Sequence, residues 1–130
     1  LLEFEFAEFF GRRRMERELA KLTDHYIICG AGRVGRTVAR ELRAQGQRCV
    51  ILEVDSARAG WAVEEKIPVI IGTGANEHTL TQAHIEQARG FVAAVSTDAD
   101  NLYIVLTARG MRADLKIIAR ASEEEATSKL

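Results

Sequence analysis

The sequence predicts an α/β fold in which a doubly wound parallel sheet of five strands, in the order 3-2-1-4-5, carries helices on both faces. Two observations support this prediction. Short, mostly apolar segments recur along the chain, as expected for strands that are buried on both faces of a sheet. Longer segments with apolar residues at helical spacing separate them, and such β-α repeats join parallel strands through right-handed crossovers.

The elements follow one another with clear boundaries. Five apolar segments are expected to form the strands, in order residues 25–29, 49–52, 68–71, 91–95 and 115–119. The segments after them are expected to form helices over residues 33–45, 56–66, 77–88, 98–109 and 123–129. Ser56, Asn76 and Ser122 stand where the second, third and last of these helices need an N-cap side chain.

The composition is that of one globular domain. The chain has 130 residues, which suffice for one domain with a core and are too few for two. Its formal net charge of −1 argues against a general nucleic-acid-binding surface, which needs a basic excess. Cys29 and Cys49 lie in apolar segments and are expected to be buried, reduced thiols. Their spacing indicates neither a disulfide framework nor a metal site.

Residues 1–22 differ from the rest and are expected to form a helical lead-in to the α/β domain of residues 23–130. Five basic side chains against two acidic ones lie in residues 12–22. Two interpretations stay open: a solvated linker helix, or a juxtamembrane segment, because Lys and Arg concentrate on the cytoplasmic side of transmembrane helices. The chain begins with Leu1 rather than Met, so we expect it to be part of a longer protein.

The first strand runs into a glycine-rich loop, Gly30-Ala31-Gly32-Arg33-Val34-Gly35. This spacing between a strand and a helix is typical of the phosphate-binding loop of a Rossmann-like fold. Gly30 permits the tight turn, Gly32 lets a phosphate approach the backbone, and Gly35 lets the helix pack closely on the strand. The start of the helix offers free N–H groups and a partial positive charge to an anion. We therefore expect the loop to bind NAD(H) or an adenine nucleotide (ATP, ADP or AMP).

An acidic residue follows the second strand. Glu53 stands where a carboxylate can accept hydrogen bonds from the ribose hydroxyls of an adenine nucleotide, and it would repel a 2′-phosphate, which favours NAD over NADP. Val54 is placed beside it in the expected binding site. Asp55 and Arg58 either contact the adenosine or simply open the next helix as a solvated turn.

Two further segments end strands at the same edge. Gly72-Thr73-Gly74, after the third strand, either lies beside an adenine ring or forms a plain turn. Ser96 and Thr97, after the fourth strand, face the same crevice in the expected topology. Asp98 follows them, and an N-cap is the simpler role for it.

These residues together resemble a known family, the RCK/KTN (TrkA-N) domains, which are cytosolic regulators of potassium channels and transporters. The resemblance covers the chain from about Lys21 onward. It rests on the segment from His25 to Gly35 and on three later segments, Asp98-Ala99-Asp100-Asn101-Leu102, Val105-Leu106-Thr107-Ala108-Arg109 and Ile117-Ile118-Ala119-Arg120-Ala121.

The resemblance implies a ligand, an assembly and a location. Domains of this kind bind NAD(H), ATP, ADP or AMP and form dimers within a gating ring at the cytoplasmic face of the cell membrane. The ring acts on a potassium pore in the same chain or in a separate subunit. Arg33 matches a family arginine that reaches a phosphate, and Arg120 matches a basic position near the phosphates. Gly72-Thr73 departs from the family's Gly-Asp, which puts an ion-binding role at that position in doubt.

No catalytic residues are predicted. A dehydrogenase needs a substrate domain and a proton-transfer residue near the nicotinamide. His25 precedes the first strand and so lies at the far edge of the sheet, and His78 and His84 read as surface or packing residues. The leading prediction is a nucleotide-binding regulatory domain of a potassium channel or transporter. The alternative is the cofactor-binding half of a NAD-dependent oxidoreductase.

Overall fold

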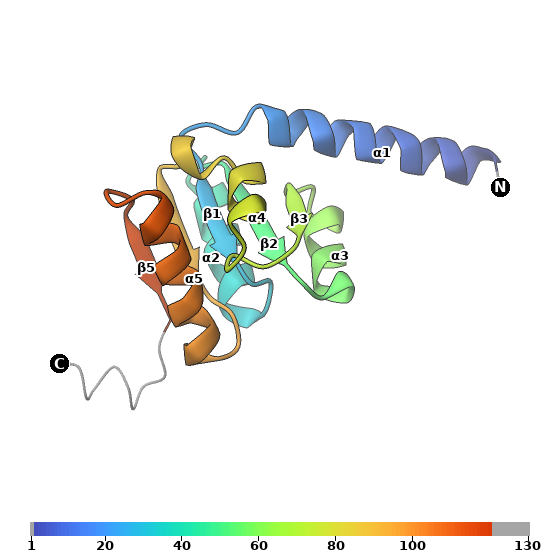
Figure 1. Cartoon of the computed structure of the whole chain (residues 1–130). Helices are drawn as coiled ribbons and strands as arrows, with labels where there is room; N and C mark the ends of the chain where they lie inside the picture. The colour runs from blue at the N-terminus through green and yellow to red at the C-terminus, as the bar shows by residue number, and fades with distance from the viewer. Residues whose placement is uncertain (1, 121–130) are drawn as a thin grey trace.

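The computed structural model describes residues 2–120 and contains one five-stranded sheet (Figure 1). All neighbouring strands pair in parallel, in the order β3-β2-β1-β4-β5, which confirms the predicted order. The strands are β1 (Tyr26–Cys29), β2 (Cys49–Glu53), β3 (Val69–Ile71), β4 (Gly90–Ala93) and β5 (Ile117–Ala119). The Ser122 cap and the last expected helix lie outside the described residues.

The strands end in register at one edge of the sheet. Cys29, the last residue of β1, is aligned with Leu52 of β2 and with Ala93 of β4. Ala93 is in turn aligned with Ala119, the last residue of β5. The loops that follow these strands therefore open at a common edge, which we call the carboxyl edge. The order of the strands reverses between β1 and β4, where open α/β sheets form a crevice.

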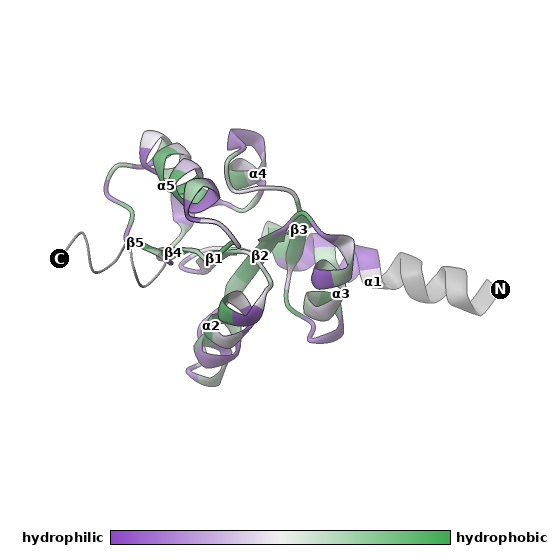
Figure 2. Ribbon diagram, turned by 90° about the horizontal axis from the view of Figure 1, so that it is seen from below, coloured by the Kyte–Doolittle hydropathy of each residue, from purple (hydrophilic) through white to green (hydrophobic). Residues whose placement is uncertain are grey.

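The helices cover the two faces of the sheet in pairs (Figure 2). On one face lie α2 (Arg33–Ala44) and α3 (Ser56–Glu64), and on the other lie α4 (Glu77–Gln82) and α5 (Asp98–Met111). Alternate strand residues feed two cores: Ile28 packs with Ala39 of α2, whereas Ile27 packs with Ile104 of α5. This alternation is the side-chain period of a strand that is buried on both faces.

The third helix is shorter than its sequence predicts. The apolar spacing indicates one helix over residues 77–88, but α4 ends at Gln82 and a 3-10 helix, η1 (Ile85–Gln87), follows. His84 separates the two with a left-handed backbone (φ 57°), and its Nδ1 lies 3.0 Å from the carbonyl oxygen of Leu22. The bend buries Ile85 in the core, so tertiary packing overrides helical continuity here.

The second helix is capped differently from the prediction. Ser56 is the first residue of α3, and the N-cap is Asp55, whose side chain accepts a hydrogen bond from the Ala57 N–H at 3.3 Å. Ser and Asp are both good caps, and the sequence has them side by side.

The lead-in forms a helix, α1 (Leu2–Ala20), which crosses the edge of the sheet where the strands begin (Figure 1). We call this the amino edge. The Met15 sulfur accepts a hydrogen bond from the Val69 N–H of β3 at 3.4 Å, and Leu19 packs against the core. In the described part of the chain, no helix combines the length and the apolar character needed to cross a bilayer.

Candidate functional site

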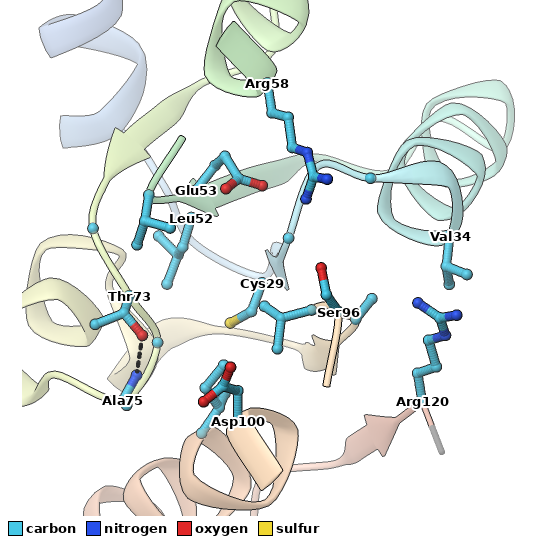
Figure 3. A pocket seen from close by; sticks show the side chains of 18 of the residues that line it. Cys29, Val34, Leu52, Glu53, Arg58, Thr73, Ala75, Ser96, Asp100 and Arg120 are labelled. Atoms are coloured by element: carbon cyan, nitrogen blue, oxygen red, sulfur yellow. Dashed lines mark hydrogen bonds between the residues drawn. The ribbon is translucent and has the colours of Figure 1, made fainter. Parts of the chain in front are cut away.

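A cleft of about 710 Å³ opens at the carboxyl edge of the sheet (Figure 3). Its floor contains Cys29, the last residue of β1, and Gly30, the first residue of the loop that follows. Ala94 and Val95, which follow β4, form part of its wall. The cleft therefore lies at the reversal point of the strand order, where the topology places a ligand crevice.

The backbone of the glycine loop is held closely against its surroundings at two positions. Gly30 has φ +105°, and a Cβ atom there would lie 2.5 Å from the carbonyl oxygen of Ala94. A Cβ atom at Gly35 would overlap the carbonyl oxygen of Gly30. Only glycine fits these two places, so the tight turn and the close helix-strand packing read from the sequence are both built into the loop.

Gly32 differs, because the space in front of it is open. A Cβ atom there would meet only an Arg58 guanidinium nitrogen, at 3.9 Å. Gly32 is the N-cap of α2, has no side chain to satisfy the first N–H groups of the helix, and is followed by a first turn without acidic residues. The positive end of α2 is thus left free toward the cleft, and an anion can approach the backbone.

Glu53 connects the end of β2 to the glycine loop. Its Oε1 accepts a hydrogen bond from the Ala31 N–H at 2.7 Å, and its Oε2 accepts one from the Asp55 N–H at 3.0 Å. The residue is buried, with 5% of its surface exposed, yet it lines the cleft. Each carboxylate oxygen keeps a further lone pair that can accept from a ribose hydroxyl.

Three arginines line the cleft from different elements. Arg33 begins α2, Arg58 lies in α3 and Arg120 follows β5. Figure 3 shows the guanidinium groups of Arg58 and Arg120 reaching toward the cleft from opposite sides. Arg58 has an exposed ion pair with Asp55, with 3.8 Å between Nε and Oδ2. Such an exposed pair is weak, so Arg58 can turn to a phosphate or a sugar without a large loss.

Asn101 of α5 ties together the segments that close the cleft near β4 and β5. Its Oδ1 accepts a hydrogen bond from the Val95 N–H at 2.9 Å, and its Nδ2 donates to the carbonyl oxygens of Val95 at 3.1 Å and Arg120 at 3.2 Å. The side chain is buried, with 2% exposed. The sequence contained this residue within the family-like segment but gave no indication of its role.

The turn after β3 is packed rather than open. A Cβ atom at Gly74 would lie 2.6 Å from the Cys29 sulfur, and one at Gly72 would lie 2.9 Å from Thr79 Oγ1. Thr73 Oγ1 accepts a hydrogen bond from the Ala75 N–H at 3.1 Å (Figure 3). The segment that the sequence suggested for an adenine ring is therefore a fixed wall of the cleft.

The structure brings most of the expected site residues into the cleft wall. These are Gly30, Gly32, Arg33, Val34, Glu53, Val54, Arg58, Gly72, Thr73, Gly74, Ser96 and Arg120. Four others lie outside its lining, namely Ala31, Gly35, Asp55 and Thr97. The Ala31 N–H donates to Glu53, and Gly35 packs against the Gly30 carbonyl group. Asp55 and Thr97 are the N-caps of α3 and α5.

The cleft also contains residues that sequence reasoning missed. They are Cys29, Leu52, Ala75, Ala94, Val95, Asp100, Tyr103 and Ile104. Several are the last residues of strands or the residues just after them, where the topology places a crevice. Asp100, Tyr103 and Ile104 have the three- and four-residue spacing of one helix face, which starts beside Ser96, so that pattern was available in the sequence.

Burial shifts the pKa of three further groups, Cys29, Cys49 and His25. Burial raises the pKa of the Cys29 thiol far above its usual value and raises that of Cys49 to about 11. His25 lies at the amino edge, fully buried, with Nε2 at 2.7 Å from the Ala83 carbonyl oxygen. Burial lowers the His25 pKa, and its Nδ1 has no hydrogen-bond partner in the described residues.

The chain is similar to proteins of potassium transport. A family model described as the TrkA-N domain matches residues 26–130. Potassium channel protein 1 of Methanocaldococcus jannaschii is 34% identical over an aligned length of 131 residues. The alignment covers 99% of this chain and 39% of the relative. A Trk system potassium uptake protein TrkA homolog of Methanothermobacter thermautotrophicus is 38% identical over 110 residues, 82% of this chain and 50% of that protein. The chain thus spans half or less of each relative.

A solved channel has the same fold with nucleotides bound. The GsuK channel bound to NAD is 26% identical, with a TM-score of 0.69 over 91% of this chain and 23% of the channel chain. The same channel bound to ADP is 26% identical, with a TM-score of 0.68 over 91% of this chain and 34% of the other.

Proposed function

The chain belongs to the TrkA-N domain family, and on that premise we propose that it senses NAD(H) or an adenine nucleotide and regulates a potassium channel or transporter. In this proposal the nucleotide binds in the cleft at the carboxyl edge. Occupancy of the cleft changes the position of the segments that border it, and that change reaches the pore.

One observation carries the proposal: the open space over Gly32 lies between the free N-terminus of α2 and the buried carboxylate of Glu53. A helix N-terminus without a capping side chain attracts a phosphate. A carboxylate at the end of the second strand accepts hydrogen bonds from a ribose. The two features match two adjacent parts of a nucleotide, its phosphate and its ribose, and solved structures of the similar GsuK channel are bound to NAD and to ADP.

The site supports NAD over NADP. Glu53 is a buried carboxylate, so a 2′-phosphate on the ribose would bring two negative charges together away from bulk water. Arg58, whose guanidinium lies 3.9 Å from a Cβ atom placed on Gly32, already has the exposed ion pair with Asp55. Its guanidinium alone does not offset that repulsion and also neutralise a phosphate dianion.

We favour regulation over catalysis, and the cofactor-binding half of an oxidoreductase is the second candidate. No histidine lines the cleft within the described residues, and the thiol in its floor is Cys29, whose raised pKa keeps it protonated. The two candidates differ in what the bound nucleotide does. Full-length protein in potassium-loaded vesicles should show a potassium flux that changes with NAD, NADH or ADP, whereas an oxidoreductase would leave the flux unchanged.

The proposed setting is the cytoplasmic face of the cell membrane, in a ring assembled from dimers. Helix α5 presents Leu102, Tyr103 and Leu106, each at least 58% exposed. Apolar residues of this size gathered on one helix are typical of an interface between chains. Tyr103 also lines the cleft, so a second copy on this face would stand at the mouth of the nucleotide site. Light scattering should give a dimer that Leu106→Glu converts to a monomer.

Thermal melting tests nucleotide binding directly. A ligand at about 100 times its dissociation constant should stabilise the folded chain by roughly 2.7 kcal/mol. NAD, NADH, AMP, ADP and ATP are compared with NADP, which should give little shift. Equal and negligible shifts with all five would contradict nucleotide sensing by this domain.

A further inference from the structure

A second hollow, of about 290 Å³, lies at the amino edge of the sheet, between α1 and the ends of α2 and α3. We call it the amino-edge groove. Glu18 of α1 and the next residues, Lys21 and Leu22, form one wall, and the body of the domain forms the rest. Figure 1 shows α1 crossing this edge. The cleft lies at the carboxyl edge of the sheet.

The charge of the amino-edge groove is strongly unbalanced. Four cationic side chains line it against the single carboxylate of Glu18, and they are Lys21, Arg43, Arg48 and Lys66. Across residues 11–120, whose side chains the structure places, none of the four cations has an ion-pair partner within 4.0 Å. The chain as a whole has a net charge of −1, so this concentration of positive charge is local. Cationic side chains that line one groove repel one another, and a bound anion reduces this repulsion.

The arrangement is partly fixed by the backbone. Arg43 Nη1 donates to the Glu65 carbonyl oxygen at 2.7 Å, which holds the guanidinium across the gap between α2 and α3. Lys66 has a left-handed backbone with φ 60°, and its N–H bonds to the Val63 carbonyl oxygen at the end of α3. Basic residues often stand at helix C-termini because of the helix dipole. Arg48 directly precedes β2 and lies in no helix, so the dipoles do not account for the whole set.

We propose that the amino-edge groove binds a phosphate group. A phosphate carries close to two negative charges and three strong acceptor oxygens, which match several converging lysine and arginine donors. Lys21 directly follows α1, whereas Arg43, Arg48 and Lys66 belong to the body of the domain. A bound phosphate therefore fastens the lead-in helix to the domain. This site is distinct from the nucleotide cleft and takes either a free phosphate compound or the phosphate of a lipid headgroup.

Amide NMR of the chain tests the proposal and separates the two sites. Titration with pyrophosphate should shift the amide signals of Lys21, Leu22, Lys66 and Ile67. Pyrophosphate bound in the cleft would instead shift the amide signals of Gly32 and Arg33, so the position of the shifted signals tells the two sites apart. Lys66→Gln and Arg48→Gln should each weaken the interaction roughly two- to fivefold, as expected for exposed ion pairs. Lys116→Gln removes an equally exposed lysine, outside both sites, and should leave the affinity unchanged.

Co-sedimentation distinguishes the sources of the phosphate. Phosphatidylcholine vesicles are compared with vesicles that also contain phosphatidic acid, for the wild type and the same three variants. Binding of either probe that depends on Arg48 and Lys66 but not on Lys116 supports the proposal. Absence of groove shifts with pyrophosphate, together with no preference for phosphatidic acid, would overturn it. An equal loss in Lys116→Gln would also overturn it, since the attraction would then be general. Lys66→Arg keeps the positive charge at this position, so it should bind as tightly as the wild type, unlike Lys66→Gln.

Discussion

The buried carboxylate of Glu53 accepts a hydrogen bond from the N–H of Ala31, so the acid at the end of β2 holds the glycine-rich loop after β1. In the proposed function, the same carboxylate accepts hydrogen bonds from a ribose. One side chain would then both hold the loop and recognise the sugar, so a ligand that engages Glu53 would act directly on the loop.

Replacement of Glu53 by alanine should remove ribose recognition. Wild-type protein should bind ADP more tightly than 2′-deoxy-ADP, because hydrogen bonds to a charged group are worth about 1.5–3 kcal/mol. Glu53→Ala should bind ADP about 10- to 100-fold more weakly and no longer distinguish the two nucleotides. Calorimetric titration measures both affinities. Glu64→Ala, which removes an exposed carboxylate outside the cleft lining, is the matched control. A variant that still prefers ADP would show that Glu53 does not contact the sugar.

Replacement of Gly35 by alanine should destabilise the domain. The added Cβ would overlap the Gly30 carbonyl oxygen, and such overpacking costs about 1–3 kcal/mol or more. Gly60→Ala is the matched control, since Gly60 also lies inside a helix but a Cβ there meets nothing within 4 Å. That change should stabilise α3 by about 0.4–1 kcal/mol. Urea unfolding gives the free energy for both variants. Similar results for the two would contradict the close packing at Gly35.

Asn101→Asp should loosen the cleft wall. The change keeps the size of the side chain but removes the N–H donors to the Val95 and Arg120 carbonyl oxygens and places a charge in a buried site. We expect a loss of at least about 2 kcal/mol in the free energy of unfolding. Asn76→Asp makes the same chemical change at the N-cap of α4, where aspartate serves as well as asparagine. Its stability should therefore be unchanged within about 0.5 kcal/mol.

Stability should fall at mildly acidic pH because of His25. Burial lowers the His25 pKa in the folded state, so between that value and the unfolded pKa of about 6.5 the unfolded chain binds more protons. The contribution of His25 to the free energy of unfolding is complete above about pH 6.5 and is lost as the pH falls toward the pKa of the folded state. Urea unfolding between about pH 7.5 and 5.5 measures the slope, which His25→Gln should flatten and the exposed-site change His78→Gln should not. A slope that is unaffected by His25→Gln would assign the loss to other groups.

The sheet was predictable because its signals are local and repeated. Apolar segments such as Ile27-Ile28-Cys29 identify buried strands, and the glycine spacing at Gly30, Gly32 and Gly35 fixes the first strand-helix junction. The break at His84 was not predictable, because it depends on contacts with Leu22 and on the burial of Ile85, which are distant in sequence or decided by packing.

The candidate site was predictable where the spacing of residues along the chain determines their positions in the fold. The glycine loop and Glu53 were found from spacing, and the structure places Gly32 and Glu53 in one cleft. The hydrogen bonds of Asn101 were not visible in the sequence, since they join α5 to the ends of two strands. The packing of Gly74 on Cys29 depends in the same way on how β1 and the turn after β3 meet in space.

The lead-in helix and the glycine loop are attached to the two ends of the same strand. β1 has only four residues, Ile27 and Ile28 within it are wholly enclosed, and it is hydrogen-bonded to a neighbour on each side. A short central strand of this kind has almost no freedom to stretch or bend. A displacement of the loop along the strand axis would therefore shift β1 as a unit and move the segment that joins it to α1.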